Sequence, residues 1–224
     1  MIVTPSSTGA AGASTPQADV LVPRPTDALL VIDVQNDFCA GGALAVPGGD
    51  DVVAPINALT GAFDTVVLTQ DWHPAGHSSF AAEHSGKAPF DTALFDYGEQ
   101  TLWPDHCVQG SHGAAFHAEL RTAPARMIIR KGFRHAIDSY SAFFENDRCT
   151  PTGLAGWLGE HGITRVVCVG LALDYCVRFS AEDARRAGFE ALVFEPACRA
   201  IDMNGSLDTA YREMQAAGVV LVNP

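Results

Sequence analysis

The stretch Val166-Val-Cys-Val-Gly-Leu-Ala-Leu-Asp-Tyr-Cys-Val177 is the strongest single indication of the fold of this chain. Its first five residues, Val166 to Gly170, are apolar and end in glycine, as in a strand buried on both faces. A helix with regularly spaced apolar residues follows and ends near Gly188. A parallel strand that leads into a helix brings the chain to the carboxyl edge of a sheet, where α/β enzymes keep their chemistry.

On this prediction Cys176 lies in the first turn of the helix, with Asp174 as its N-cap. Free backbone N–H groups and the helix dipole lower the pKa of a thiol in that position, which is the setting of a nucleophile. A small core residue in an apolar helix is an equally good interpretation, because most free cysteines are used in that way.

Short apolar runs recur along the rest of the chain and alternate with segments of helical period. The other expected strands are 28–32, 65–69, 126–130, 191–194 and 219–222, and the other expected helices are 50–63, 152–160 and 206–216. This alternation predicts an α/β fold, a three-layer sandwich with a central, mainly parallel sheet and helices on both faces. We expect one domain, 27–224, after a flexible leader, residues 1–26, that is rich in Ser, Thr, Gly, Ala and Pro.

The composition limits the classes of partner and compartment. The net charge of −12 argues against binding to nucleic acid or to anionic membrane surfaces. No apolar run approaches the roughly 20 residues of a membrane span, and the first segment lacks the pattern of a secretion signal. Six irregularly spaced cysteines without a C-x-x-C pair indicate reduced thiols and a cytoplasmic protein. A homo-oligomer is compatible with all of this, and the sequence does not decide the oligomeric state.

Three ionisable side chains follow predicted strands and should meet at one edge of the sheet: Asp33, Lys131 and Cys176. A charged group directly after a buried strand is costly unless it is paired. The Lys131 ammonium would favour a thiolate and hold Asp33 ionised, and Asp33 could take the thiol proton and return it to a leaving group. Taken singly, Asp33 is better explained as a turn former and Lys131 as a solvated lysine, and it is their joint placement with Cys176 that favours a site.

A long irregular region, residues 72–125, holds most of the histidines. Asp71 and His73 are two apart in extended chain and point the same way, and His106 could close a site from the other end of the loop. A carboxylate with two imidazoles suits Zn²⁺, Fe²⁺ or Mn²⁺, and His77 is a further candidate ligand. Histidines in a loop can also be merely exposed, and others occur nearby, at His84, His112 and His117.

Five motifs together make the chain resemble the nicotinamidases (pyrazinamidases) of the isochorismatase-like cysteine hydrolases, from about residue 27 to the C-terminus. They are Asp33-Val-Gln-Asn-Asp-Phe38, Asp71-Trp-His-Pro-Ala-Gly-His-Ser-Ser-Phe80, Trp103-Pro-Asp-His-Cys-Val-Gln109, Lys131-Gly132 with Asp138-Ser-Tyr-Ser-Ala-Phe143, and Gly170-Leu-Ala-Leu-Asp-Tyr-Cys-Val177. The first and last are shared across that superfamily, whereas the second and third mark the branch that hydrolyses nicotinamide.

The resemblance implies roles for particular residues. The catalytic triad would be Asp33, Lys131 and Cys176, and the metal ligands would be Asp71, His73 and His106, with His77 as a further ligand or a neighbour. An oxyanion hole would use the backbone N–H groups of Ala172 and Cys176, beside a cis peptide at Leu171-Ala172. The aromatic side chains that hold the pyridine ring would be Phe38, Trp103 and Tyr140. Leu173 departs from the threonine that is usual there, which can alter the turn or the pocket wall.

The resemblance also implies a reaction: metal-dependent hydrolysis of nicotinamide to nicotinate and ammonia through a cysteine thioester, as in NAD salvage, with pyrazinamide as a second substrate. The metal would be Zn²⁺, with Fe²⁺ and Mn²⁺ as alternatives. Three other functions stay open on the sequence. They are a cysteine amidohydrolase acting on a carbamoyl or ureido compound, a binding protein without turnover, and a zinc hydrolase in which Cys176 belongs to the core.

Overall fold

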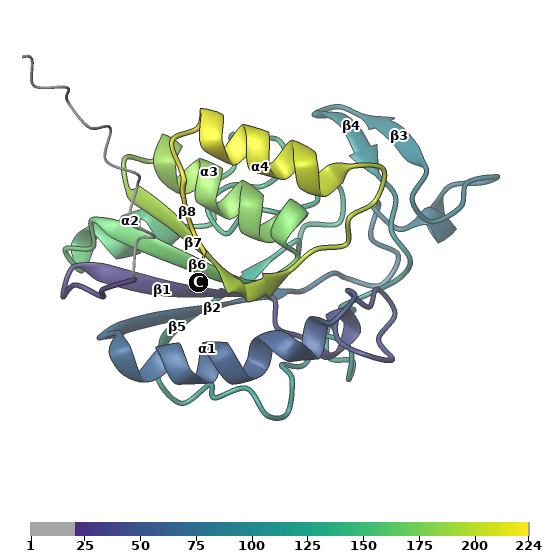
Figure 1. Cartoon of the computed structure of the whole chain (residues 1–224). Coiled ribbons are helices and arrows are strands. Elements are labelled where there is room, and N and C mark those ends of the chain that lie inside the picture. The colour runs from purple at the N-terminus through teal and green to yellow at the C-terminus, as the bar shows by residue number, and fades with distance from the viewer. Residues whose placement is uncertain (1–20, 224) are drawn as a thin grey trace, which may run out of the picture.

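The structure is a computed structural model that describes residues 21–223 (Figure 1). Most of the predicted leader, residues 1–20, therefore lies outside the described residues. The strands of the main sheet are β1 (Asp27–Ile32), β2 (Thr65–Asp71), β5 (Ala125–Lys131), β6 (Arg165–Leu171), β7 (Glu190–Arg199) and β8 (Val220–Val222). They are ordered β5-β2-β1-β6-β7-β8, and every neighbouring pair is parallel.

The three strands β1, β2 and β6 are buried over their whole length, as expected of strands that are covered on both faces. The edge strand β5 instead alternates between exposed and covered residues, with Ile128 half exposed and Ile129 buried. The carboxyl ends of β1, β2, β5 and β6 meet at one edge of the sheet, so the ionisable residues that follow them can share a site.

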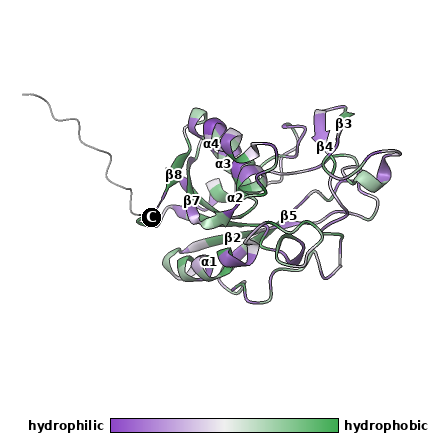
Figure 2. Ribbon diagram, turned by 45° about the vertical axis from the view of Figure 1, so that its right-hand side comes forward, coloured by the Kyte–Doolittle hydropathy of each residue, from purple (hydrophilic) through white to green (hydrophobic). Residues whose placement is uncertain are grey.

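Helices cover both faces of the sheet, which confirms the three-layer sandwich (Figure 1). Helix α1 (Val53–Leu59) packs on one face through Val53 and Ile56. Apolar side chains of three helices form the core on the other face, namely α2 (Leu154–Glu160), α3 (Arg178–Arg186) and α4 (Ser206–Ala216). Figure 2 shows the apolar strands enclosed between these layers, with hydrophilic residues on the outward sides of α3 and α4.

Two local structures differ from the sequence prediction. The region 72–125 contains a short antiparallel hairpin, β3 (Thr92–Phe95) with β4 (Gly98–Thr101), whose exposed strands lack an apolar period. Cys176 lies in a π-helical turn, Leu173–Val177, before α3 begins at Arg178. The prediction of Asp174 as an N-cap is wrong, because its carboxylate accepts hydrogen bonds from the segment after β7 and not from the turn.

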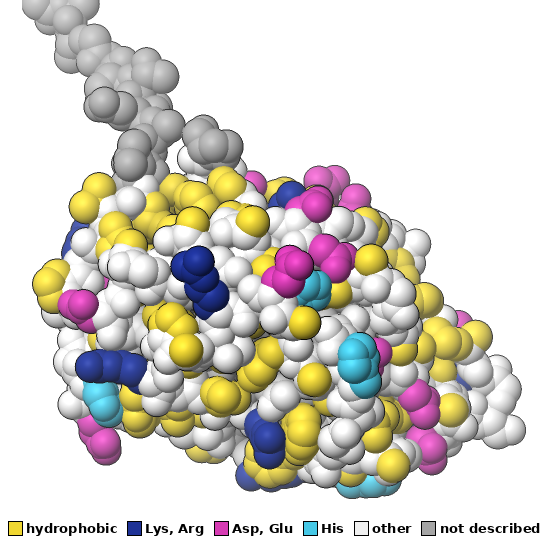
Figure 3. Space-filling view, turned by 90° about the horizontal axis from the view of Figure 1, so that it is seen from below, with side chains coloured by type: hydrophobic (Ala, Val, Ile, Leu, Met, Phe, Trp, Pro, Cys, Tyr) yellow, Lys and Arg dark blue, Asp and Glu magenta, His cyan; other side chains and the backbone are white. Residues whose placement is uncertain are grey.

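The structure also shows how the charged side chains and the cysteines are distributed. Figure 3 shows the face that α1 covers, on which basic side chains are scattered and lie among acidic ones. All six cysteines are free. Within residues 21–223, no helix has the length and apolar character to cross a bilayer.

Candidate active site

The predicted acid, ammonium and thiol meet at the carboxyl edge of the sheet. The Lys131 Nζ atom lies 2.8 Å from Asp33 Oδ2 and 3.5 Å from Cys176 Sγ, and it donates to the Ser139 carbonyl oxygen at 2.9 Å. The three side chains come from the ends of β1 and β5 and from the turn after β6. All three residues are at least nine-tenths buried. Their charged forms are therefore stabilised by one another and not by water.

Burial decides the protonation of this group. It raises the pKa of the Cys176 thiol well above its usual range, although the Lys131 ammonium opposes the shift. It also raises the pKa of Asp33 against the same ammonium. Burial alone would lower the pKa of Lys131, yet the carboxylates of Asp33 and Asp71 hold that pKa well above its usual value. The pKa of the thiol is therefore raised and not lowered as predicted, because desolvation outweighs the attraction of Lys131.

Asp33 is held by a residue that the sequence did not single out. Its Oδ1 atom accepts a hydrogen bond from the Thr69 hydroxyl at 2.6 Å, and its own N–H donates to that hydroxyl at 3.1 Å. Asp33 Oδ2 has the Lys131 ammonium beside it as an ion pair but makes no hydrogen bond. Thr69 thus fixes one carboxylate oxygen and leaves the other facing the cation and the thiol.

The three predicted metal ligands also come together, next to Lys131. One ligand atom each of Asp71, His73 and His106 lies within 4.8 Å of the others, and all three residues are buried. The Nε2 atoms of His73 and His106 lie 3.2 and 3.5 Å from Asp71 Oδ2. Asp71 Oδ1 lies 3.1 Å from Lys131 Nζ, which joins the metal-ligand set to the triad.

Hydrogen bonds to backbone carbonyls orient both imidazoles. The Nδ1 atoms of His73 and His106 lie 2.9 and 2.8 Å from the carbonyl oxygens of Gly132 and Pro104. A carbonyl only accepts, so each Nδ1 carries the ring proton that faces it, and each Nε2 is the atom that faces Asp71 and can bind a metal ion. Two Nε2 atoms and a carboxylate oxygen that lie close together fit a divalent metal ion, and such outer hydrogen bonds are usual for metal-bound histidines.

Gly132 allows this packing, because a Cβ atom there would lie 2.5 Å from His73 Cε1 and its φ is +64°. Burial opposes ionisation of Asp71, but His73 and Lys131 hold the pKa of its carboxyl well below its usual value. His77 packs beside His73, with ring centroids 4.4 Å apart. Both ring nitrogens of His77 are engaged, Nδ1 with Ser79 Oγ at 2.8 Å and Nε2 with the Arg134 carbonyl at 2.9 Å.

An aromatic cavity opens beside the thiol and the metal-ligand set. It is lined by all three predicted ring-binding residues, Phe38, Trp103 and Tyr140, together with Asp71, His106, Ala172 and Cys176. Tyr175, Leu44, Ile201 and Asp138 complete the wall and were not predicted. Leu173 is buried in the core and is not part of this wall.

The turn that carries Cys176 has two unusual features. The peptide between Leu171 and Ala172 is cis, as the resemblance implied. The carboxylate of Asp174 accepts from the N–H groups of Ile201 and Asp202, at 3.0 and 2.8 Å. Asp174 thereby ties the turn that carries Cys176 to the segment that supplies Ile201 to the cavity wall.

A comparison with known protein families places the chain in one of them. The model of the isochorismatase domain matches residues 27–223. The chain belongs to the isochorismatase family. Within this family it is 57% identical over 192 residues to a nicotinamidase of Acinetobacter baylyi, covering 86% of this chain and 90% of that one.

Two solved structures of the family superpose on the fold. A nicotinamidase and pyrazinamidase of Acinetobacter baumanii has a TM-score of 0.88 at 55% identity, covering 89% of this chain and 97% of its own. A pyrazinamidase of Pyrococcus horikoshii in complex with zinc has a TM-score of 0.71 at 35% identity, covering 89% and 100%. The chain is therefore an amidohydrolase of this family, with side chains that can hold a metal ion.

Proposed function

We propose that this chain hydrolyses nicotinamide to nicotinate and ammonia, with pyrazinamide as a second substrate, through a thioester on Cys176. The observation that carries the proposal is the contact of Lys131 with both halves of the site, 3.5 Å from the Cys176 sulfur and 3.1 Å from Asp71 of the metal-ligand set. A pyridine ring held at one half would present its amide to the other. The similarity to nicotinamidases over most of the chain supports the same substrate.

In the first half-reaction the Cys176 sulfur attacks the amide carbon while its proton passes to Asp33. The raised pKa of Asp33 makes its carboxylate a better base than an ordinary aspartate, and the charged Lys131 stabilises the thiolate as it forms. Backbone N–H groups of Ala172 and Cys176 would stabilise the oxyanion, a contribution of about 3 kcal/mol for each donor in comparable sites. The C–N bond then breaks, and Asp33 returns the proton to the leaving nitrogen as ammonia.

In the second half-reaction Asp33 takes a proton from water, and the water oxygen attacks the thioester carbon. The C–S bond breaks, nicotinate leaves, and the proton returns to the sulfur. Phe38, Trp103 and Tyr140 would hold the ring in this cycle.

Asp71, His73 and His106 would hold the metal ion, and we infer zinc, because one carboxylate and two imidazoles suit it and a zinc complex of a relative has the same fold. When bound, the ion supplies a Lewis acid that holds the ring nitrogen of a pyridine amide. His77 would act as a neighbour that packs against His73.

Ammonia release from nicotinamide, pyrazinamide and a ureido compound tests the proposal. We expect turnover of the two pyridine-type amides, none in Cys176→Ala, and full activity in the matched control Cys149→Ser, whose thiol is exposed. Ammonia release by Cys176→Ala would refute the nucleophile, and a preference for the ureido compound would refute the substrate. Chelation should stop turnover and leave the fold intact. Unfolding on chelation would indicate a structural metal instead.

A further inference from the structure

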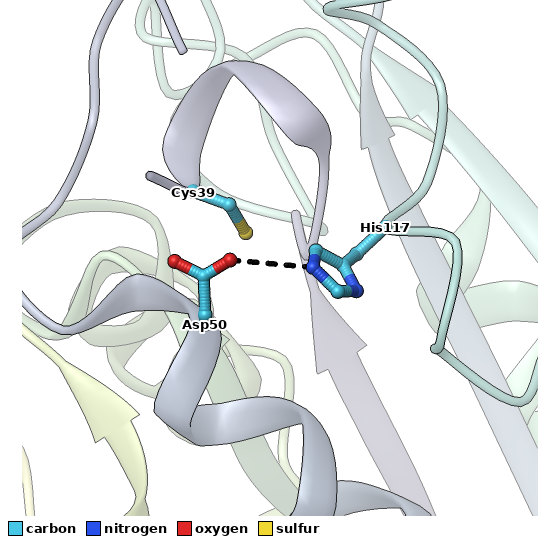
Figure 4. Close-up of side chains that lie close together, drawn as sticks. All are labelled: Cys39, Asp50 and His117. Carbon is cyan, nitrogen blue, oxygen red and sulfur yellow. Dashed lines mark ion pairs between the residues drawn. The ribbon is translucent and has the colours of Figure 1, made fainter. Parts of the chain in front are cut away.

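Outside the candidate active site, three side chains of metal-binding type meet near the surface: Cys39, Asp50 and His117 (Figure 4). One ligand atom of each lies within 4.8 Å of the others. They come from three separate segments: the residue after the short helix η1 (Asn36–Phe38), the helix η2 (Gly49–Val52), and the loop between β4 and β5. The fold thus gathers sulfur, oxygen and nitrogen donors that are far apart in sequence.

Hydrogen bonding explains the positions of two of these side chains but not the third. His117 Nε2 lies 3.3 Å from Asp50 Oδ1, and the Ala40 N–H donates to Asp50 Oδ2 at 2.8 Å. The Cys39 sulfur points at the same carboxylate and imidazole (Figure 4). Cys39 is only 2% exposed, and its sulfur makes no hydrogen bond within residues 21–223. The sulfur is therefore available as a third ligand beside the carboxylate and the imidazole.

A reactive thiol is a poorer explanation of Cys39. The imidazole of His117 faces Asp50, and no Lys or Arg side chain of residues 21–223 makes a hydrogen bond or ion pair with the Cys39 sulfur, whereas Lys131 lies 3.5 Å from the Cys176 sulfur in the active site.

We propose that Cys39, Asp50 and His117 bind one divalent transition-metal ion of the zinc class, separate from the ion of the active site. A thiolate, an imidazole and a carboxylate are all ligands that Zn²⁺ and Co²⁺ accept, and Mg²⁺ or Ca²⁺ would not select the sulfur. The Asp50 side chain is 45% exposed, so an ion can enter from solvent and keep water in its fourth position.

The hydrogen bond on the other side of the ring limits the affinity. The Glu119 N–H donates to His117 Nδ1 at 3.2 Å, which keeps the ring proton on Nε2 in the metal-free chain. Binding through Nε2 moves that proton to Nδ1 and removes this hydrogen bond. Loss of an outer hydrogen-bond partner typically weakens metal affinity by about 10- to 100-fold, so the ion should exchange with solvent metal.

Such an ion would restrict the motion of one wall of the substrate cavity. The segment 39–50 begins directly after Phe38 and contains Leu44, and both residues line that cavity. An ion on Cys39 and Asp50 joins the two ends of this segment to His117. The metal site itself does not depend on which amide the chain hydrolyses.

Titration with Co²⁺ tests the site, because a cobalt–thiolate bond gives a charge-transfer band in the near ultraviolet. All proteins carry Cys176→Ala, so that the active-site sulfur cannot contribute, and circular dichroism checks their folding. We expect the parent to show the band and to bind one equivalent of Co²⁺ more than its Cys39→Ser variant, which should lose the band. Cys149→Ser, which removes an exposed thiol, is the matched control and should behave as the parent.

Asp50→Asn keeps the proposal testable if Cys39→Ser does not fold, because this substitution lies on the surface and changes one atom. It should weaken Co²⁺ binding at this site at least tenfold and leave the other equivalent bound. A parent without the band, or a band that survives in Cys39→Ser, would overturn the proposal and leave Cys39, Asp50 and His117 as a structural contact.

Discussion

Thr69→Val is the perturbation that most directly tests how Asp33, the proposed proton acceptor, is held. Valine has nearly the shape of threonine, so the change leaves no cavity at this fully buried position. It removes the 2.6 Å hydrogen bond to the Asp33 carboxylate and leaves the Asp33 N–H, 3.1 Å from the former hydroxyl, without a partner. The first loss costs about 2 kcal/mol and the second about 1 kcal/mol, so the free energy of unfolding should fall by about 3 kcal/mol.

The same substitution should move the pH profile. The Thr69 hydroxyl lowers the pKa of Asp33, against burial, which raises it. Without the hydroxyl the pKa of Asp33 rises further, and the carboxylate that accepts the thiol proton is lost at a higher pH. The acidic limb of kcat/KM for ammonia release should therefore shift to higher pH.

Urea unfolding and the pH–rate profile measure these two effects, with Thr69→Ser as the control that keeps the hydroxyl. We expect Thr69→Ser to retain the acidic limb of the parent. If Thr69→Val leaves the limb in place, or if Thr69→Ser shifts it equally, then the hydroxyl does not set the protonation of Asp33 and the reasoning fails.

Three further substitutions probe the rest of the site. Gly132→Ala places a Cβ atom 2.5 Å from the His73 ring at a φ of +64°, so the metal content retained after dialysis should fall about tenfold. An unchanged metal content would show that the His73 ring can shift to accept the Cβ atom. Asp174→Asn removes the charged acceptor of the Ile201 N–H, so KM should rise several-fold with little change in kcat, and an equal loss in both would argue against a role at the cavity wall. The depressed pKa of Asp71 stabilises the metal-free fold above the ordinary carboxyl pKa, and that contribution disappears as the pH falls below about 4. Asp71→Asn should flatten this acid dependence in chelator-treated protein, and equal slopes for the two proteins would refute the assignment.

The ends of the strands are predictable from the sequence, whereas contacts between strands are not. Asp33 follows an unbroken apolar run and Lys131 follows the expected strand 126–130, which marks both residues before any coordinates exist. Thr69 lies beside Asp33 only because β1 and β2 pair with Val31 opposite Leu68, and a register between residues 37 apart in sequence leaves no local pattern. The sequence offered one signal for this contact. Thr69 is a polar residue in the expected strand 65–69, which follows the expected strand 28–32 that precedes Asp33.

The turn that carries Cys176, Leu173–Val177, shows a second limit of sequence reasoning. Asp174 has the residue type and position of an N-cap, but its carboxylate bonds to Ile201 and Asp202, 27 and 28 residues later. The thiol pKa was also misjudged, because a helix-end argument considers local dipoles and ignores how deeply the fold buries Cys176. Both errors arise from long-range packing that overrides a local preference.

The six-stranded sheet separates the two chemical functions of the site along the chain. The imidazoles of His73 and His106 come from the long segment between β2 and β5, whereas the Cys176 sulfur follows β6. That long segment contributes no strand to the main sheet. Its length and composition can therefore vary without shifting the register that aligns Asp33 with Lys131. Exchanging loops within this segment would therefore be the most direct way to an enzyme that accepts a different ring and keeps its acylation chemistry.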